Sequence, residues 1–218
     1  MLIEPGSKLL FIGDSITDCG RARPVAEGNE VGNGYVSLIN ALLGALYPAH
    51  GIRVFNMGVN GNTVRDLKAR WRKDVLDQQP DWLVIFIGVN DVWRQFDTPL
   101  RIEQHVLIDE YRRELESLIK QTLPHLQGLV LMTPYFLEPN CDDPMREAMD
   151  AYGDVVRELA AIYGAVLVDT QAAMNVLLEQ MHPMSLAWDS IHLNQTGHMA
   201  LALAFMRAFP AREHAIVL

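Results

Sequence analysis

Five short apolar runs divide the chain, and the stretches between them carry apolar residues at helical spacing. Most of the runs are continuous rather than alternating, which is typical of parallel strands that are covered on both faces. The pattern therefore predicts five buried strands, at residues 9–12, 54–55, 83–87, 129–132 and 165–168.

Helices are predicted between these runs, several with recognisable starts. Thr63 with Asp66 three positions later resembles a capping box, and Asp143 before Pro144 is a cap followed by proline at the first helical position. Thr170 and Asn194 are further candidate caps. The predicted helices cover residues 35–47, 63–76, 103–123, 143–163, 170–180 and 195–209.

Strands that alternate with helices predict an α/β fold, a three-layer α/β/α sandwich around a five-stranded parallel sheet. No repeat, low-complexity tract or linker interrupts the chain, so a single domain is expected over residues 1–218. Ligands of such sheets bind beyond the carboxyl ends of the strands. The irregular, glycine-containing segment 20–34 is long enough to suggest a functional loop.

Composition narrows the function. The 218 residues carry a formal net charge of -9, which argues against nucleic-acid binding because phosphate contacts need clustered Lys and Arg. No run approaches the roughly 20 apolar residues of a membrane span, and the N-terminus lacks the apolar region of a signal peptide. Cys19 and Cys141 are interpreted as reduced thiols of a cytoplasmic protein with no membrane partner.

The chemically richest segments follow the predicted strands. Residues 13–17 place Ser15 at a strand-to-helix turn, where its hydroxyl is exposed and backbone N–H groups can face an anion. Residues 56–63 contain Gly58 and Gly61, which allow close approach of the backbone to a ligand. Each pattern alone is as well explained by a turn and a helix cap.

Two further patterns complete a set. Asn90 lies after the third strand and offers a side-chain amide to an oxyanion, although an Asx turn is an equal interpretation in isolation. Asp189 precedes His192 by three positions, so it can hold one ring nitrogen and leave the other as a base. Together with Ser15, these groups supply what acyl transfer requires: a nucleophile, oxyanion donors, a base and its orienting carboxylate.

The four segments, in this order, resemble the conserved blocks of the SGNH (GDSL-type) serine hydrolases. The resemblance implies a flavodoxin-like SGNH fold, with Ser15 as nucleophile, His192 as base and Asp189 beside it. It also implies an oxyanion hole made by Ser15, Gly61 and Asn90. Two positions depart from the usual blocks without removing a catalytic group: Asn60, where serine is common, and Leu193, where proline is frequent.

Longer runs, at residues 11–24, 61–71 and 90–95, resemble the intracellular bacterial acetylxylan esterases within this family. That similarity implies removal of acetyl groups from acetylated xylo-oligosaccharides through an acetyl-enzyme on Ser15. A small acetylated saccharide is then the expected partner, and a homo-oligomer that shields the cleft is compatible with it. The alternatives are a lipase or thioesterase acting on longer acyl groups, a non-catalytic flavodoxin-like binding module and a catalytically inactive interaction protein.

Other residues have two interpretations each. Asp14 and Arg21 are candidate substrate-binding residues, as is Trp93, which can stack on a sugar or simply pack. Trp188 is a further candidate, but a packing role is favoured for it. No cofactor and no metal site are expected, because the remaining histidines lack metal-ligand spacing. A cysteine nucleophile is not expected either, because Cys19 has no evident histidine partner. Those histidines are His50, His105, His125, His182, His198 and His214, with His198 predicted to be structural.

Overall fold

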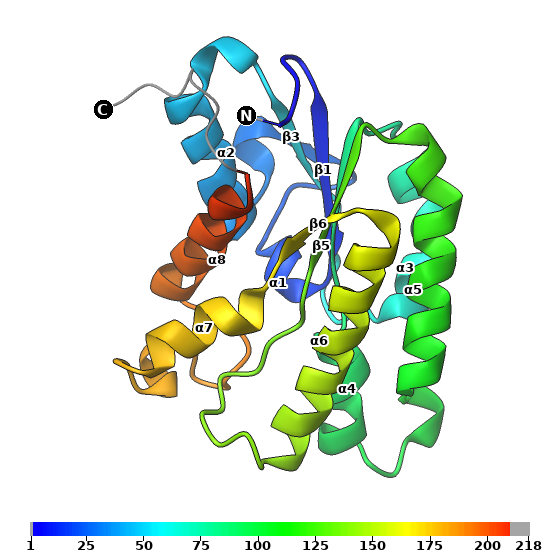
Figure 1. Cartoon of the computed structure of the whole chain (residues 1–218), viewed down its shortest axis with the longest axis vertical. Helices are drawn as coiled ribbons and strands as arrows, with labels where there is room; N and C mark the ends of the chain where they lie inside the picture. Colours follow the sequence, from blue (N-terminus) through cyan, green and yellow to red (C-terminus); the bar gives the residue numbers. More distant parts are fainter. Residues whose placement is uncertain (1, 210–218) are drawn as a thin grey trace.

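The computed structural model describes residues 2–209 and is built around a six-stranded sheet in the order β2-β3-β1-β4-β5-β6 (Figure 1). Five of these strands are parallel and coincide with the five apolar runs, which confirms the α/β prediction. Their apolar side chains are buried because helices cover both faces, except for Val166 and Leu167 of the edge strand β6, which are partly buried. The parallel strands are β1 (Lys8–Gly13), β3 (Arg53–Asn56), β4 (Trp82–Phe86), β5 (Gly128–Met132) and β6 (Val166–Val168).

The predicted count of five strands was wrong by one. The sixth strand, β2 (Ala26–Glu27), lies antiparallel to β3 and pairs Ala26 with Asn56 at the sheet edge. It has two residues and lies in the segment that was predicted to be irregular. Neither length nor apolar pattern marks such a strand, because its conformation is set by pairing with β3 rather than by its own side chains.

Helices form the outer two layers, as predicted (Figure 1). One face of the sheet is covered by α2 (Tyr35–Leu46), α7 (Thr170–Leu178) and α8 (Gln195–Ala208), and the other by α3 (Val64–Trp71), α4 (Val89–Asp97), α5 (Ile108–Thr122) and α6 (Pro144–Tyr163). The short α1 (Ser15–Asp18) follows β1 directly, and a five-residue π-helix, Arg72–Leu76, extends α3. Single 3-10 turns lie at Gly28–Glu30, Pro48–His50, Ile102–Gln104, Leu123–His125 and Pro183–Ser185.

Most of the predicted N-cap residues cap their helices in the structure. Asp143 accepts hydrogen bonds from the second and third backbone N–H groups of α6, and Asn194 does the same for α8. Thr63 and Asp66 form the predicted capping box of α3. The prediction for Thr170 was wrong, because Asp169 caps α7 and Thr170 is its first helical residue.

Two helices differ from prediction by more than a residue or two at their ends. The predicted helix at 103–123 begins only at Ile108, after a 3-10 turn. The second difference is α4, which was not predicted at all, because residues 88–91 resembled a turn at a strand end. The Asn90 amide is therefore held on the first turn of a helix and not on a loop, which restricts its movement.

The strand order determines where chemistry can gather. β1 lies between β3 and β4, so the segments that leave the carboxyl ends of these three strands meet at one edge. This is the position at which the chain direction across the sheet reverses, where open α/β sheets bind ligands. Within residues 2–209, no helix combines the length and apolar character needed to span a membrane.

Candidate active site

Ser15, His192 and Asp189 form a continuous hydrogen-bonded relay. The Ser15 Oγ lies 2.9 Å from His192 Nε2, and His192 Nδ1 lies 2.6 Å from Asp189 Oδ2. Ser15 is the first residue of α1, immediately after β1, and Asp14 caps that helix by accepting from the Ile16 N–H at 2.9 Å. The relay therefore joins the strand-to-helix turn of β1 to the segment that precedes α8.

The backbone around Asp189 makes it a rigid partner for the imidazole. Its Oδ1 accepts from the N–H groups of Ile191 and His192 at 3.0 and 2.8 Å, and Ser190 turns the chain with a φ of 63°. Burial alone raises the pKa of Asp189, but the hydrogen bonds from the His192 ring and these two N–H groups outweigh it and hold the pKa below 3.8. An ionised Asp189 accepts a hydrogen bond from the Nδ1–H group, which leaves His192 Nε2 free to accept the proton of Ser15.

Three potential oxyanion donors come from the ends of β1, β3 and β4. Among the described residues, the backbone N–H groups of Ser15 and Gly61 donate to no protein acceptor. The Asn90 side-chain N–H₂ group donates one hydrogen bond to Asn62 O at 3.0 Å, and the side-chain oxygen accepts one from Arg94 at 3.3 Å, so the amide orientation is defined. The second Asn90 proton remains for a ligand. Unused donors of this kind are what an oxyanion hole consists of.

Close packing of the β3 loop brings Gly61 to this edge. A Cβ at Gly58 would lie 2.4 Å from the backbone nitrogen of Asp18, so only glycine allows the loop to approach α1 this closely. Gly61 itself has a φ of 76°, in the left-handed region that glycine adopts without cost. The expected close approach of this loop is therefore realised against α1.

Asp91 ties the Asn90 turn to the start of α3. Its Oδ1 accepts from the Val64 N–H at 2.9 Å, while its Oδ2 has no partner among the described residues. Burial raises the pKa of Asp91 to about 8 and that of Asp14 to about 7, because neither carboxylate can be solvated. Both carboxyls thus keep their protons to a higher pH in the folded chain than in the unfolded one.

Replacing Asp91 by asparagine is expected to change the pH dependence of stability. The Asp91 carboxyl contributes stability that is fully present below pH 3.8 and is lost as the pH rises to about 8, because only the folded chain holds the proton in that range. Asparagine keeps the acceptor for Val64 and does not titrate. The unfolding temperature of Asp91→Asn relative to wild type should therefore rise between pH 5 and pH 8, by at least about 2–4 °C, which is the effect of roughly 1 kcal/mol.

Thermal unfolding of both proteins at several pH values, followed by circular dichroism, checks this. Asp14 titrates in both proteins, so its contribution cancels in the difference. A difference in unfolding temperature that stays constant with pH would show that Asp91 is ionised in the folded chain throughout.

A hollow of about 550 Å³ opens in front of the relay. Asp18, Arg23 and Asn60 line it together with Ser15 and His192, and Cys19 and Gly20 complete the wall. No Leu, Ile, Val, Met, Phe, Tyr or Trp side chain is among these residues. The contribution of Asp18 and Asn60 was not predicted, although they flank the recognised motifs in the sequence.

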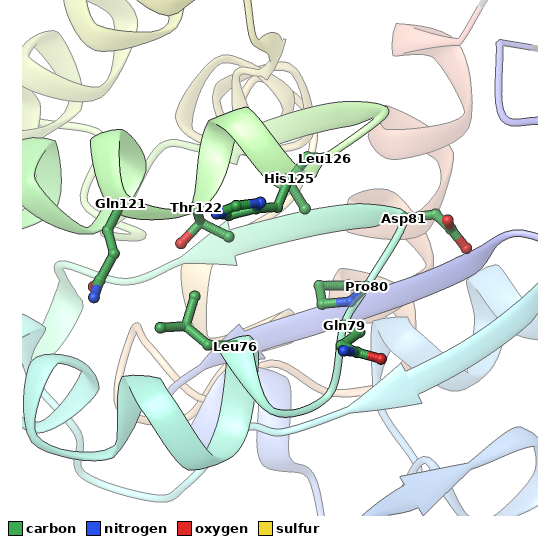
Figure 2. Close-up of a pocket in the computed structure, with 8 residues that line it drawn as sticks. All are labelled: Leu76, Gln79, Pro80, Asp81, Gln121, Thr122, His125 and Leu126. Carbon is green, nitrogen blue, oxygen red and sulfur yellow. The ribbon is translucent and has the colours of Figure 1, made fainter.

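A larger hollow, of about 640 Å³, lies at the other end of the sheet (Figure 2). Figure 2 shows side chains of the connection before β4 facing side chains from the end of α5. It includes Asp81, directly before β4, and so lies at the amino end of that strand. None of the predicted site residues is part of it, and we assign it no role in the chemistry.

The candidate substrate-binding residues differ in whether a ligand can reach them. Asp14 is 1% exposed and Arg21 is 6% exposed, so neither is available to a ligand. The Arg21 guanidinium donates to three backbone oxygens, including that of Gly58 at 2.6 Å. Trp93 is half-buried with its ring centroid 5.8 Å from that of His192. The packing role favoured for Trp188 was wrong, because this side chain is 79% exposed.

Cys19 does have a histidine partner, contrary to the prediction. Its Sγ lies 3.4 Å from His198 Nε2, and His198 Nδ1 accepts from the Tyr35 N–H at 3.3 Å. His198 therefore carries its proton on Nε2 and donates it to sulfur. Burial, with the nearby His192, lowers the pKa of His198 to about 4, and burial with the acidic neighbours of Cys19 raises its pKa to about 12. The histidine thus cannot activate this thiol, and Cys19 is no competitor to Ser15.

Residues 2–209 contain no group of three or more His, Cys, Asp or Glu side chains placed to hold a metal ion. His214, one of the histidines considered in the sequence, lies outside the described residues.

Comparisons with known proteins agree with this geometry. Residues 11–200 match the model of the GDSL-like Lipase/Acylhydrolase family. An acetylxylan esterase from Geobacillus stearothermophilus is 56% identical over 209 residues, 95% of each chain. The crystal structure of Axe2, an acetylxylan esterase from Geobacillus stearothermophilus, has a TM-score of 0.96 at 54% identity and covers 97% of this chain and 98% of that one.

A second solved structure is that of LAE5, an α/β hydrolase enzyme from the metagenome of Lake Arreo, Spain. It has a TM-score of 0.92 at 48% identity, covering 95% of this chain and 97% of that one. Further structures of Axe2 are catalytic mutants, in which alanine replaces one serine, one histidine or one aspartate.

Proposed function

Since the chain belongs to the GDSL-like lipase/acylhydrolase family, we propose that it is a serine esterase that removes acetyl groups from acetylated xylo-oligosaccharides. The observation that carries the proposal is the relay from Ser15 through His192 to Asp189 at the carboxyl edge of the sheet. The high identity to an acetylxylan esterase over nearly the whole chain supports the substrate class.

The geometry supports a two-step mechanism. His192 Nε2 accepts the Ser15 proton as the hydroxyl oxygen attacks the acetyl carbonyl, and Asp189 stabilises the imidazolium that forms. The tetrahedral oxyanion accepts hydrogen bonds from the unused donors of Ser15, Gly61 and Asn90. His192 then protonates the ester oxygen of the sugar as its bond to the acetyl carbon breaks, which releases the sugar hydroxyl and leaves an acetyl group on Ser15. Water, deprotonated by His192, attacks this acetyl-enzyme, and His192 returns the proton to Ser15 Oγ as acetate is released.

The side chains that line the hollow favour a small acyl group on a polar alcohol. Asp18, Arg23 and Asn60 offer hydrogen-bonding groups to sugar hydroxyls, whereas a long acyl chain needs an extended apolar wall. Arg23 is paired with Asp18 Oδ2, so the pair presents both a donor and an acceptor without net charge. This contrast distinguishes the proposal from a lipase or thioesterase on the same fold.

Trp188 is proposed to stack on the saccharide, since it is exposed directly beside Asp189. Trp188→Ala should raise KM for an acetylated xylo-oligosaccharide by about threefold to tenfold, the effect of losing one aromatic contact. The kcat for a simple aryl acetate should stay within about twofold, because the relay is untouched. Steady-state kinetics on both substrates check this, with the exposed and remote Val176 of α7, as Val176→Ala, as the control. An unchanged KM for the oligosaccharide would remove Trp188 from the binding site.

A substrate series tests the function itself. The protein should release acetate from peracetylated xylotriose and from an aryl acetate, and its kcat/KM should fall steeply from aryl acetate to aryl octanoate. Rapid turnover of the octanoate ester would favour the lipase or thioesterase alternative. Turnover of the aryl acetate alone would keep the esterase and remove the sugar assignment.

A non-catalytic flavodoxin-like binding module is the alternative from a different class. It would leave the Asn90 amide and the Asp189–His192 pair without a role. Absorbance spectra of the purified protein distinguish the two, because such a module would carry a bound flavin or nucleotide and show no esterase activity.

We also propose that the chain forms a single domain and acts in the cytoplasm, in keeping with the low cysteine content. A homo-oligomer stays a prediction.

A further inference from the structure

Arg70 of α3 makes more contacts with the candidate site than its sequence position suggests. Its side chain is 16% exposed, and its guanidinium donates four hydrogen bonds. Nη2 donates to Gly13 O at 2.9 Å, Nη1 donates to Met57 O at 2.7 Å and Nε donates to Asn62 Oδ1 at 2.7 Å. The fourth bond, from Nη1 to Asp74 Oδ2 at 2.8 Å, fixes the guanidinium on its own helix.

These acceptors lie at both ends of the β3 loop and at the end of β1. Gly13 is two residues before Ser15, and its oxygen also accepts from the Val59 N–H at 3.0 Å. Met57 and Asn62 flank the segment that contains Gly61. One rigid, planar cation therefore spans the two segments that carry the unused backbone donors of Ser15 and Gly61.

The connection continues to the third donor. The side chain of Asn62 accepts from Arg70, and its backbone oxygen accepts from the Asn90 amide at 3.0 Å. A displacement of Asn62 therefore moves the Gly61 N–H and the Asn90 amide together. All three proposed oxyanion donors depend on acceptors that Arg70 holds directly or through one residue.

We propose that Arg70 is the positioning residue of the oxyanion hole, an inference that rests on the proposed esterase function. It contacts no substrate atom in this role. It aligns the donors of Ser15, Gly61 and Asn90 before the reaction, so that no reorganisation is needed when the oxyanion forms. Lysine cannot replace it, because a single ammonium cannot reach Gly13 and Asn62 from the directions that the guanidinium fork serves.

Arg70→Met removes the donors and retains much of the apolar stem. The kcat for an aryl acetate should fall by about tenfold to a hundredfold, since misplacement by roughly 1 Å costs about that much. KM should stay within about twofold, because the oxyanion donors act on the transition state and not on the bound ester. Arg70→Lys should lose a similar share of kcat. The acidic limb of the kcat/KM pH profile should not move, because the Ser15–His192–Asp189 relay is intact.

Arg146 provides a matched control. It lies on α6, its side chain is 4% exposed and it pairs with Asp150 four residues on, as Arg70 pairs with Asp74. It also donates to a backbone oxygen, that of Glu138, in a segment that contacts Ser190 but none of the three proposed oxyanion donors. Arg146→Met should therefore lower the unfolding temperature as Arg70→Met does, and leave kcat within about twofold of wild type.

The outcomes distinguish a failure of the esterase function from a failure of the positioning role of Arg70. An inactive wild type would overturn the esterase function, whereas an active wild type with unchanged kcat in Arg70→Met would overturn the positioning role alone. Equal losses of kcat in Arg70→Met and Arg146→Met would likewise reduce Arg70 to a general stabilising residue. If Arg70→Met does not fold, Asn62→Ala tests the same link: kcat should fall by about fivefold or more at constant KM, and an unchanged kcat would overturn the proposal.

Discussion

Ser15→Ala should lower kcat for acetate release by roughly 10⁵- to 10⁶-fold, the loss seen when a triad nucleophile is removed. The hydroxyl is the group that His192 Nε2 faces at 2.9 Å, and no other nucleophile replaces it. The neighbouring thiol of Cys19 stays protonated, because burial and acidic neighbours raise its pKa to about 12. The measurement is release of acetate from peracetylated xylotriose and from an aryl acetate, with enzyme concentrations high enough to detect the residual rate.

Ser37 serves as the control, since it lies on α2 away from the relay. Ser37→Ala should retain full activity. Mass spectrometry of wild type, quenched during turnover, should find the acetyl group on the peptide that contains Ser15. Full activity in Ser15→Ala would remove Ser15 from its role, and with it the mechanism proposed for this chain.

Asp189→Asn should lower kcat by about 10⁴-fold without unfolding the chain. Asparagine can still accept from the N–H groups of Ile191 and His192 through its oxygen, so the turn is retained. Its amide would face His192 Nδ1 with a proton, which favours the tautomer that carries hydrogen on Nε2. That tautomer donates to Ser15 and cannot take its proton.

Steady-state kinetics over a wide pH range, with thermal unfolding as the test of integrity, check this prediction. The residual rate of Asp189→Asn should rise at high pH, where hydroxide can deprotonate Ser15 directly. Asp150→Asn removes a carboxylate from a remote ion pair and should leave the rate intact. A loss of only a few-fold in Asp189→Asn would mean that the orientation of His192 does not depend on this carboxylate.

Much of the fold could be predicted because its signals are local. Continuous apolar runs mark β1, β3, β4, β5 and β6, since each strand is buried on both faces. Capping side chains such as Asp143 and Asn194 mark helix starts because they bond to N–H groups only two or three residues away. β2 carries neither signal: its two residues are strand only because β3 lies beside them.

The relay could be proposed from sequence because Ser15 and the Asp189–His192 pair follow recognisable patterns, and the structure places their side chains in hydrogen-bond contact. The roles of the residues that support the relay could not be predicted from sequence. Arg70 resembles any polar residue on an amphipathic helix, and its four acceptors lie in distant parts of the chain. The prediction for Trp188 failed because it followed a general tendency: tryptophan is usually buried, and only the fold shows that this one is not.

The contact between Ser15 and His192 joins positions 177 residues apart. Closing so long a loop costs conformational entropy, which the packing of the whole sandwich must offset. The serine lies at the end of the central strand β1, and the histidine lies directly before α8, which packs against α2. Turnover therefore requires that α8 has docked against α2. An esterase assay during refolding then follows completion of the native topology, whereas far-UV spectroscopy follows the helix content alone.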